Sequence, residues 1–175
     1  AVFHDRVLHF EGLPNTGRAQ FGQKALPYWI VKKEPDVILT LGDFWMLSWM
    51  WKSDYVQPHC YWYPIDGVPV TDDIIRMLKR VDIPVAFSKF GKRLVTEAGI
   101  RTHYVPHGVN TKVFRPLPQH VKEETRREYG LPPKAFVVGR VDRNQRRKMY
   151  PQTLKAFKIF KKWYPDSVLY LHCDK

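Results

Sequence analysis

Residues 105–116 have the sequence VPHGVNTKVFRP, and residues 135–148 have the sequence AFVVGRVDRNQRRK. The first stretch has the form of a strand end, a glycine-containing turn and a connector closed by proline. The second is an apolar strand that leads into five cationic side chains within nine residues. A connector followed by a strand-to-helix turn rich in arginine and lysine predicts two α/β domains with an anionic ligand, a phosphate, held between them.

Upstream of the connector, short apolar runs alternate with amphipathic segments. Strands are predicted at residues 36–42, 60–63, 83–87 and 102–105. Helices are predicted at residues 20–33, with a kink or break at Pro27, and at residues 44–51 and 71–80. A further helix is predicted after Ser88, and its inward-facing stripe consists of Phe90, Leu94, Val95 and Ala98. Alternating strands and helices of this length predict a doubly wound, parallel α/β domain.

Three residues predict where two of these helices begin or end. Thr71 and Ser88 have side chains that accept a hydrogen bond from a backbone amide in the first turn. Gly99 supplies the left-handed conformation that ends the second helix.

The segment 110–119 contains Pro116 and Pro118 and has little periodicity, so we place the domain boundary there, giving domains of residues 1–115 and 116–175. The second domain is predicted to contain helices at residues 121–129 and 152–164 and strands at residues 135–138 and 167–172. In the second of these helices, the residues predicted to face inward are Leu154, Phe157, Phe160 and Trp163 or Tyr164. Two strands and two helices cannot cover their own sheet. We therefore expect an internal piece of a longer protein, or a chain that needs a partner.

The net charge of +12 predicts an acidic partner, which is a nucleic acid, an anionic membrane surface or a phosphorylated ligand. A solvated, lysine-rich surface explains the same charge. Cys60 and Cys173 have no metal-site spacing, and we interpret them as buried thiols of a reducing compartment. There is no apolar run long enough to span a bilayer and no charged leader, so we expect a cytoplasmic protein with a peripheral membrane contact at most.

Five segments occur in an order and at spacings that resemble one enzyme family. They are residues 33–43 (KEPDVILTLGD), 83–99 (IPVAFSKFGKRLVTEAG), 105–116 (VPHGVNTKVFRP), 127–148 (REYGLPPKAFVVGRVDRNQRRK) and 153–172 (TLKAFKIFKKWYPDSVLYLH). Together they resemble the GT-B glycosyltransferases, in the retaining group known as group 1 or family 4. The resemblance covers most of residues 30–175.

The resemblance implies an α/β fold of two Rossmann-like domains, of which the C-terminal one binds most of the nucleotide-sugar donor. This chain would hold the N-terminal, acceptor-side domain, incomplete at its N-terminus, and the beginning of the C-terminal domain. The family's glycine-rich loop and Glu-x7-Glu element are both missing. We therefore expect the piece to be inactive alone. The implied reaction is metal-independent sugar transfer with retention, from a UDP- or GDP-linked donor to a carbohydrate, lipid or protein acceptor.

The family turn that contacts the donor diphosphate carries an arginine and a lysine, and Arg147 and Lys148 match it best, with Arg140 and Arg143 as second choices. Arginine supplies paired, permanently charged donors, and lysine supplies a compact charge, so both suit a diphosphate whose negative charge grows as it leaves. A solvated basic turn, or a nucleic-acid patch, explains the same residues without a donor site.

Four residues are candidates on the acceptor side or at the hinge. His107 and Gly108 end the last strand of the first domain, and the resemblance places this turn near the transferring sugar. Asp66, in a Pro/Gly-framed loop, is a candidate to orient or deprotonate an acceptor hydroxyl. Gly108 and Asn110 are assigned to the hinge or the cleft. Each candidate also has a structural explanation that is equally good. His107 fits a hydrogen-bonded structural histidine, Asp66 fits an Asp-Gly turn, and Asn110 fits a residue that shapes a turn. Asp43 follows a strand in the same way as Asp66, and for it we prefer the role of a helix cap.

The aromatic cluster Trp45, Trp49, Trp51, Tyr61, Trp62 and Tyr63 fits either a core or a surface for sugar rings or lipid, and the alternation at residues 61–63 predicts that half of it is exposed. No metal-binding motif or cofactor motif is present in the sequence. Two further classes stay open: a basic nucleic-acid-binding module, for which no motif is found, and a non-catalytic scaffold that keeps the GT-B shape.

Overall fold

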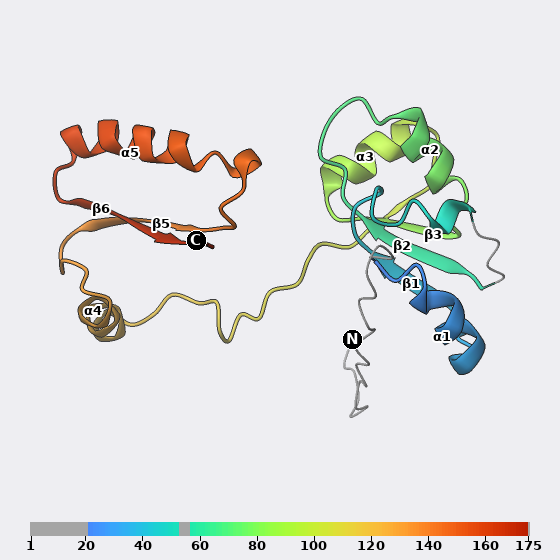
Figure 1. Ribbon diagram of the computed structural model, residues 1–175, viewed down its shortest axis with the longest axis horizontal. Helices are drawn as coiled ribbons and strands as arrows, with labels where there is room; N and C mark the ends of the chain where they lie inside the picture. Colours follow the sequence, from blue (N-terminus) through green and yellow to red (C-terminus); the bar gives the residue numbers. More distant parts are fainter. Residues whose placement is uncertain (1–20, 53–56, 175) are drawn as a thin grey trace. The chain divides into compact units, whose positions relative to one another are not determined.

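The computed structural model describes residues 21–52 and 57–174 (Figure 1). The chain divides into two compact units, residues 1–109 and 110–175, called unit 1 and unit 2 below. The sequence places the domain boundary at residues 115 and 116, a few residues later. Both positions fall in the stretch 105–118, which contains turns but no helix or strand.

Unit 1 is a mixed α/β unit built on a parallel sheet of four strands (Figure 1). The strands are β1 (Ile38–Leu41), β2 (His59–Tyr63), β3 (Ile83–Ala86) and β4 (His103–Tyr104), in the order β1-β2-β3-β4. The helices are α1 (Ala25–Lys33), the short 3-10 helix η1 (Met50–Lys52), α2 (Asp72–Leu78) and α3 (Lys89–Glu97). The prediction of a parallel α/β sheet is confirmed.

The local start and stop signals of α2 and α3 are confirmed. The Thr71 hydroxyl accepts a hydrogen bond from the Ile74 amide at 3.5 Å, and the Ser88 hydroxyl accepts one from the Gly91 amide at 3.0 Å. Gly99 follows α3 with φ of +82°, a conformation that glycine adopts without strain. Both helices therefore begin where a side chain satisfies a backbone amide that has no partner within the helix.

Two predictions about helices in unit 1 are wrong. The segment 44–51 forms turns that end in η1, because Leu47, Met50 and Trp51 turn into the core. The Asp43 carboxylate accepts a hydrogen bond from the Trp45 indole rather than capping a helix. The helix predicted from residue 20 begins only at Ala25, so that Pro27 lies in the first turn, where an amide hydrogen is not needed.

The inward stripe of α3 is also shifted from the prediction. Phe90 is exposed, and Gly91 is buried in its place. A Cβ atom at position 91 would lie 3.2 Å from the Cβ of Ile65, so a larger residue here would have to displace Ile65 by a few tenths of an ångström. This contact rotates the buried face toward Gly91 and Val95.

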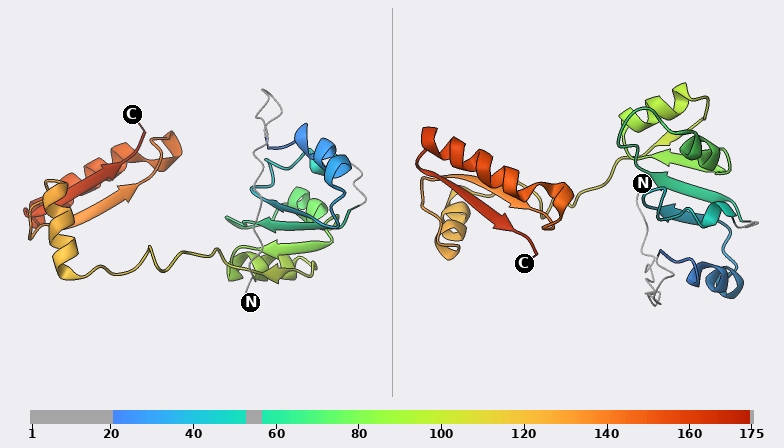
Figure 2. Two further views of the ribbon diagram at one scale, coloured as in Figure 1. Left: turned by 90° about the horizontal axis from the view of Figure 1, so that it is seen from below. Right: turned by 45° about the horizontal axis from the view of Figure 1, so that its top comes forward.

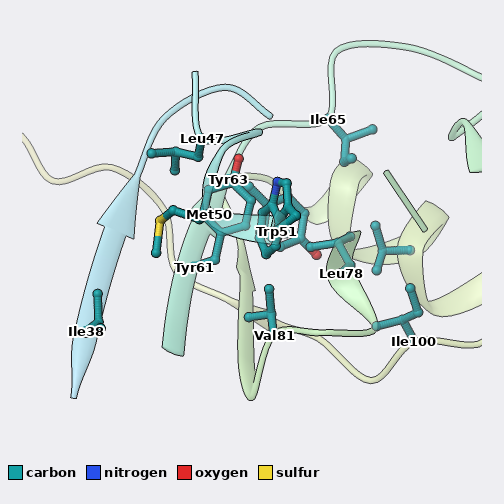
Figure 3. Packing of buried hydrophobic residues seen from close by; sticks show 12 residues of the cluster. Ile38, Leu47, Met50, Trp51, Tyr61, Tyr63, Ile65, Leu78, Val81 and Ile100 are labelled. Carbon is teal, nitrogen blue, oxygen red and sulfur yellow. The ribbon is translucent and has the colours of Figure 1, made fainter. Parts of the chain in front are cut away.

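The core of unit 1 lies on one face of the sheet and is rich in aromatic rings (Figure 3). Tyr61 and Tyr63 are fully buried, and Trp51 packs against Tyr61 with ring centroids 5.6 Å apart. The alternation predicted for β2 is confirmed by the partly exposed Trp62. On the opposite face, Leu39 of the edge strand β1 is 68% exposed, so β1 is not the fully buried strand that its apolar sequence predicts.

Unit 2 contains a parallel pair of strands, β5 (Phe136–Val141) and β6 (Ser167–His172). The helices α4 (Gln119–Glu128) and α5 (Tyr150–Trp163) lie on opposite sides of this pair, and the 3-10 helix η2 (Arg146–Lys148) precedes α5 (Figure 2). β5 extends three residues beyond the predicted end at residue 138, which puts Arg140 inside the strand.

The inward face of α5 differs from the prediction. Tyr150 is buried, and Thr153, Phe157 and Phe160 are partly buried, whereas Leu154 is 51% exposed and Trp163 is 73% exposed. The buried Tyr150 at the start of the helix determines which side of α5 faces the strands.

Of the two free cysteines, Cys60 is partly buried but Cys173 is exposed, which corrects the prediction of two buried thiols. No helix in the described ranges is long and apolar enough to cross a bilayer.

Candidate functional site

The strands of unit 1 run in parallel, so the loops that follow them leave from one edge of the sheet. Asp43 lies two residues after β1, and Asp66 lies three residues after β2. The two loops enclose a cavity of about 460 Å³, which both carboxylate residues line. The structure therefore brings together two acidic residues that are 23 positions apart in the sequence (66 − 43).

The lining of this cavity, called the carboxylate cavity below, is apolar except for its two acids. It is made by Asp43, Phe44, Trp45, Pro64, Ile65, Asp66, Gly67, Val68, Pro69, Val70 and Ile74. Trp45 is 63% exposed, and its indole N–H donates to the Asp43 carboxylate at 3.1 Å. In the described residues, Asp66 is exposed and has neither an ion pair nor a hydrogen bond. The Asp66 carboxylate is thus available to a ligand.

The core of unit 1 holds the first of these loops in place. Phe44 packs edge-on against Tyr61 with ring centroids 5.3 Å apart, and the Tyr61 hydroxyl donates to the Gly42 carbonyl at 2.9 Å. Burial raises the pKa of Tyr61 far above its ordinary value, and the nearby charge of Asp43 adds to this effect. The phenol therefore stays protonated and keeps donating to the loop.

The second loop is held through Ile65. This residue is buried and packs against Gly91 of α3, and Asp66 follows it directly at the surface. The position of Asp66 is therefore set by the packing of α3 on the sheet. Asp66 is followed by Gly67 and Pro69, as expected for a turn that projects a polar side chain.

His107 does not line the carboxylate cavity. Its ring packs against Phe87 at 4.2 Å and against Trp62 at 4.6 Å between centroids. The Trp62 indole donates to the Val105 carbonyl at 2.8 Å, which ties the segment before His107 to β2. These contacts favour a packing role for the histidine ring, although its other side is exposed to solvent.

The two residues proposed for the hinge have simple local roles in the structure. Gly108 does not adopt the left-handed conformation, and a Cβ atom built on it would contact nothing within 4 Å. Neither the backbone conformation nor a close contact among the described residues therefore requires glycine at this position. The Asn110 side chain accepts a hydrogen bond from the Lys112 amide at 3.0 Å, which is the turn-shaping role.

In unit 2, the predicted cations divide into two groups. The first group, Arg140 and Lys148, is engaged inside the unit. Lys148 pairs with Asp142. The Arg140 guanidinium has several partners. It donates to the Thr153 hydroxyl and to the Lys148 carbonyl, and it lies over the Tyr150 ring with its central carbon 4.0 Å from the centroid. Arg140 thus joins β5, η2 and α5.

Asp142 completes this network. Its carboxylate lies 3.1 Å from the Lys148 ammonium and 3.7 Å from the Arg140 guanidinium, and it accepts a hydrogen bond from the Arg143 amide at 3.0 Å. Desolvation acts to raise the pKa of Asp142. The pKa is nevertheless lowered by the hydrogen bond and charge of Lys148, by the hydrogen bond from the Arg143 amide and by the charge of Arg140. Asp142 is therefore charged at neutral pH, and it fixes the position of Lys148.

The second group consists of Arg143, Arg146 and Arg147, which are exposed. None of the three forms an ion pair with another described residue. They stand beside the paired Lys148 in the turn between β5 and α5, called the cationic turn below. This turn is fixed by Arg140 and Asp142, and its free side chains can bind an anion.

Sequence reasoning missed three residues of this arrangement. Asp142 is the one carboxylate in residues 140–148, and this isolation among five cations is the signal that could have identified it. Tyr150 and Thr153 give no such signal, because their contacts with Arg140 depend on how α5 packs on β5. Within the part of the chain that the structure describes, no group of three or more His, Cys, Asp or Glu side chains could hold a metal ion.

The comparison with known proteins adds no further assignment to the carboxylate cavity or the cationic turn. The chain matches no model of a known protein family, and a search of the curated proteins found no match.

Proposed function

We propose that this chain is part of a nucleotide-sugar-dependent glycosyltransferase of the GT-B type, with unit 1 binding the acceptor and unit 2 binding the donor. Three features support the proposal. The five segments follow the order of the retaining group 1 family, both sheets are parallel, and the cationic turn follows the first strand of unit 2. The transfer proceeds with retention and without a metal ion.

The observation that carries the proposal is the fixed cationic turn. Lys148 has three N–H donors, and its pairing with Asp142 leaves donors for phosphate oxygens. Arg147 is exposed and can present two parallel donors to the same group. Internal contacts hold the Lys148 carbonyl and ammonium in place, so the turn presents its cations from a fixed position when the charge of the leaving diphosphate grows.

The proposal gives Arg140 and Arg143 different roles from Arg147 and Lys148. The Arg140 guanidinium is occupied by Thr153, Lys148 and Tyr150, so we assign it to positioning the turn. Arg143 contributes its amide to Asp142, and its exposed side chain adds to the positive field around the donor.

On the acceptor side, Asp66 orients or deprotonates the attacking hydroxyl, because its carboxylate lines a cavity and has no other partner among the described residues. His107 lies at the same edge of the sheet, held between Phe87 and Trp62. We assign it to the boundary of the acceptor region.

The test is the double substitution Arg147→Ala/Lys148→Ala. Each lost charge-assisted hydrogen bond is worth about 1.5–3 kcal/mol, so UDP or GDP binding should weaken by roughly 100-fold or more. Calorimetry measures binding by the chain, and nucleotide-sugar turnover is measured in the full-length enzyme.

The matched control is Lys155→Ala/Lys158→Ala, which removes the same charge from exposed positions on α5. Nucleotide binding should be unchanged in this variant. An equal loss in both variants would instead indicate a diffuse electrostatic attraction, as in a nucleic-acid-binding module, and would overturn the donor site. Unchanged binding in Arg147→Ala/Lys148→Ala would overturn it as well.

A further inference from the structure

The carboxylate cavity has a charge opposite to that of the whole chain. The chain has a net charge of +12, yet Asp43 and Asp66 are the charged residues among the eleven that line the cavity. An anionic ligand placed there would meet two carboxylates and no cation of the lining. The cavity therefore selects against phosphates and nucleotides, which the cationic turn attracts.

Trp45 gives the cavity an apolar platform. Trp45 is 63% exposed, and its ring contacts Phe21 edge-on, with centroids 5.2 Å apart. Its indole N–H is taken by Asp43, which fixes the orientation of the ring and leaves its face for a ligand. Phe44 cannot serve in the same way, because it packs against Tyr61 and Tyr63 in the core.

One exposed indole beside two carboxylates suits a ring that is apolar on one face and has hydroxyl donors around its rim. The face of the ring stacks on the indole, and ionised carboxylates accept hydrogen bonds from hydroxyl groups. A quaternary ammonium ion is better bound by several aromatic faces that surround it. The volume of about 460 Å³ lies in the range of small-molecule sites.

We propose that the carboxylate cavity binds a neutral carbohydrate, with the sugar ring on Trp45 and its hydroxyl groups on Asp66 and Asp43. Asp66 supplies the free acceptor oxygens, and Asp43 supplies an oxygen beside the indole N–H. The assignment of this sugar as the acceptor rests on the proposed transferase function. The binding itself depends only on unit 1.

The experiment follows the indole N–H signal of Trp45 in nuclear magnetic resonance spectra of the whole chain, assigned by its loss in Trp45→Ala. The probes are the methyl glycosides of glucose, mannose and galactose, the disaccharide maltose, choline, and inorganic pyrophosphate. At least one saccharide should shift the signal in a saturable way. Neither choline nor pyrophosphate should do so.

Two variants test the contacts. Because Trp45→Ala lacks the reporter indole, its saccharide binding is followed by the backbone amide signals of Asp66 and Gly67, which line the cavity. This variant should weaken saccharide binding by about tenfold or more, since it removes the stacking surface of the indole. Asp66→Asn keeps the shape of the side chain but not its charge, and should weaken binding by several-fold. The matched control is Trp163→Ala, which removes an indole that is 73% exposed in unit 2 and should leave saccharide binding unchanged.

Three results would overturn the inference: no saccharide shifts the Trp45 signal, choline alone shifts it, or Trp163→Ala weakens binding as much as Trp45→Ala. The test of saccharide binding can be distinguished from the test of the donor site. Arg147→Ala/Lys148→Ala should bind the saccharide normally while it loses nucleotide. Loss of nucleotide binding without any saccharide binding would keep the donor site and refute the carbohydrate cavity.

Discussion

Units 1 and 2 share the polarity of their parallel strands but differ in two respects. Unit 1 has a deep core, in which Tyr61, Tyr63, Leu78 and Val95 are almost fully inaccessible, whereas the buried residues of unit 2 are Ala135, Tyr150 and Ser167. The loops after β1 and β2 carry the carboxylates Asp43 and Asp66, whereas the loop after β5 carries the exposed cations Arg143, Arg146 and Arg147. The same local architecture therefore presents opposite charges in the two units, so the side chains rather than the fold determine which ligand each unit can bind.

The difference in core depth is tested most strongly by Leu78→Ala in unit 1. Leu78 is 1% exposed, and its truncation leaves a cavity in the core, which costs about 2–5 kcal/mol. Phe160→Ala in unit 2 is the matched variant, and it should cost less because Phe160 is only partly buried. Hydrogen exchange measured on peptides of each unit separates the two effects. A larger loss of protection from Phe160→Ala than from Leu78→Ala would refute the comparison.

The sequence predicts those features that depend on neighbouring residues. Thr71, Ser88 and Gly99 act within one helical turn, so they behave as predicted. Which face of α3 and of α5 is buried cannot be predicted in this way. The buried faces depend on the contact of Gly91 with Ile65 and on the burial of Tyr150, which involve residues distant in the sequence.

The same distinction applies to the candidate sites. The cations of the turn are visible in the sequence, but the internal contacts of Arg140 arise only when α5 packs on β5. Asp43 and Asp66 are each visible as acids after a strand. Their meeting in one cavity depends on the parallel register of β1 and β2, in which Leu41 pairs with Trp62.

The beginnings of α3 and α5 offer a second, smaller test of the difference between the units. Ser88 caps α3, whereas α5 follows Met149, which has φ of +57° and no side-chain cap. Ser88→Ala should destabilise unit 1 by about 1 kcal/mol. Met149→Gly should stabilise unit 2 by up to about 1 kcal/mol, because glycine adopts this conformation without strain.

Denaturant unfolding monitored by peptide-resolved hydrogen exchange measures both changes. Thr96→Ala, at an exposed position within α3, is the control for Ser88→Ala and should have little effect. If Met149→Gly destabilises unit 2, the left-handed conformation at residue 149 is not a source of strain, and the contrast between the two helix starts fails.

The smallest expected effect is a pH dependence confined to unit 1. His59 is buried, and its ring nitrogen Nε2 lies 2.7 Å from the Thr40 hydroxyl. Burial lowers the pKa of His59 below its ordinary value of 6.5, and the nearby charge of Asp82 offsets part of this effect. The unfolded chain therefore binds a proton at a higher pH than the folded chain does, and unit 1 should lose stability as the pH falls through and below 6.5.

Hydrogen exchange of unit 1 peptides at pH 7.5 and pH 5.5, corrected for the intrinsic exchange rate, measures this loss. The variant His59→Gln should have a weaker dependence, whereas His103→Gln, at an exposed position, should keep that of the original chain. Unit 2 should change little over the same range, since the pKa of its carboxylate Asp142 is lowered and its pairing with Lys148 is lost only in stronger acid. Equal destabilisation of both units between pH 7.5 and 5.5 would show that His59 does not set the response.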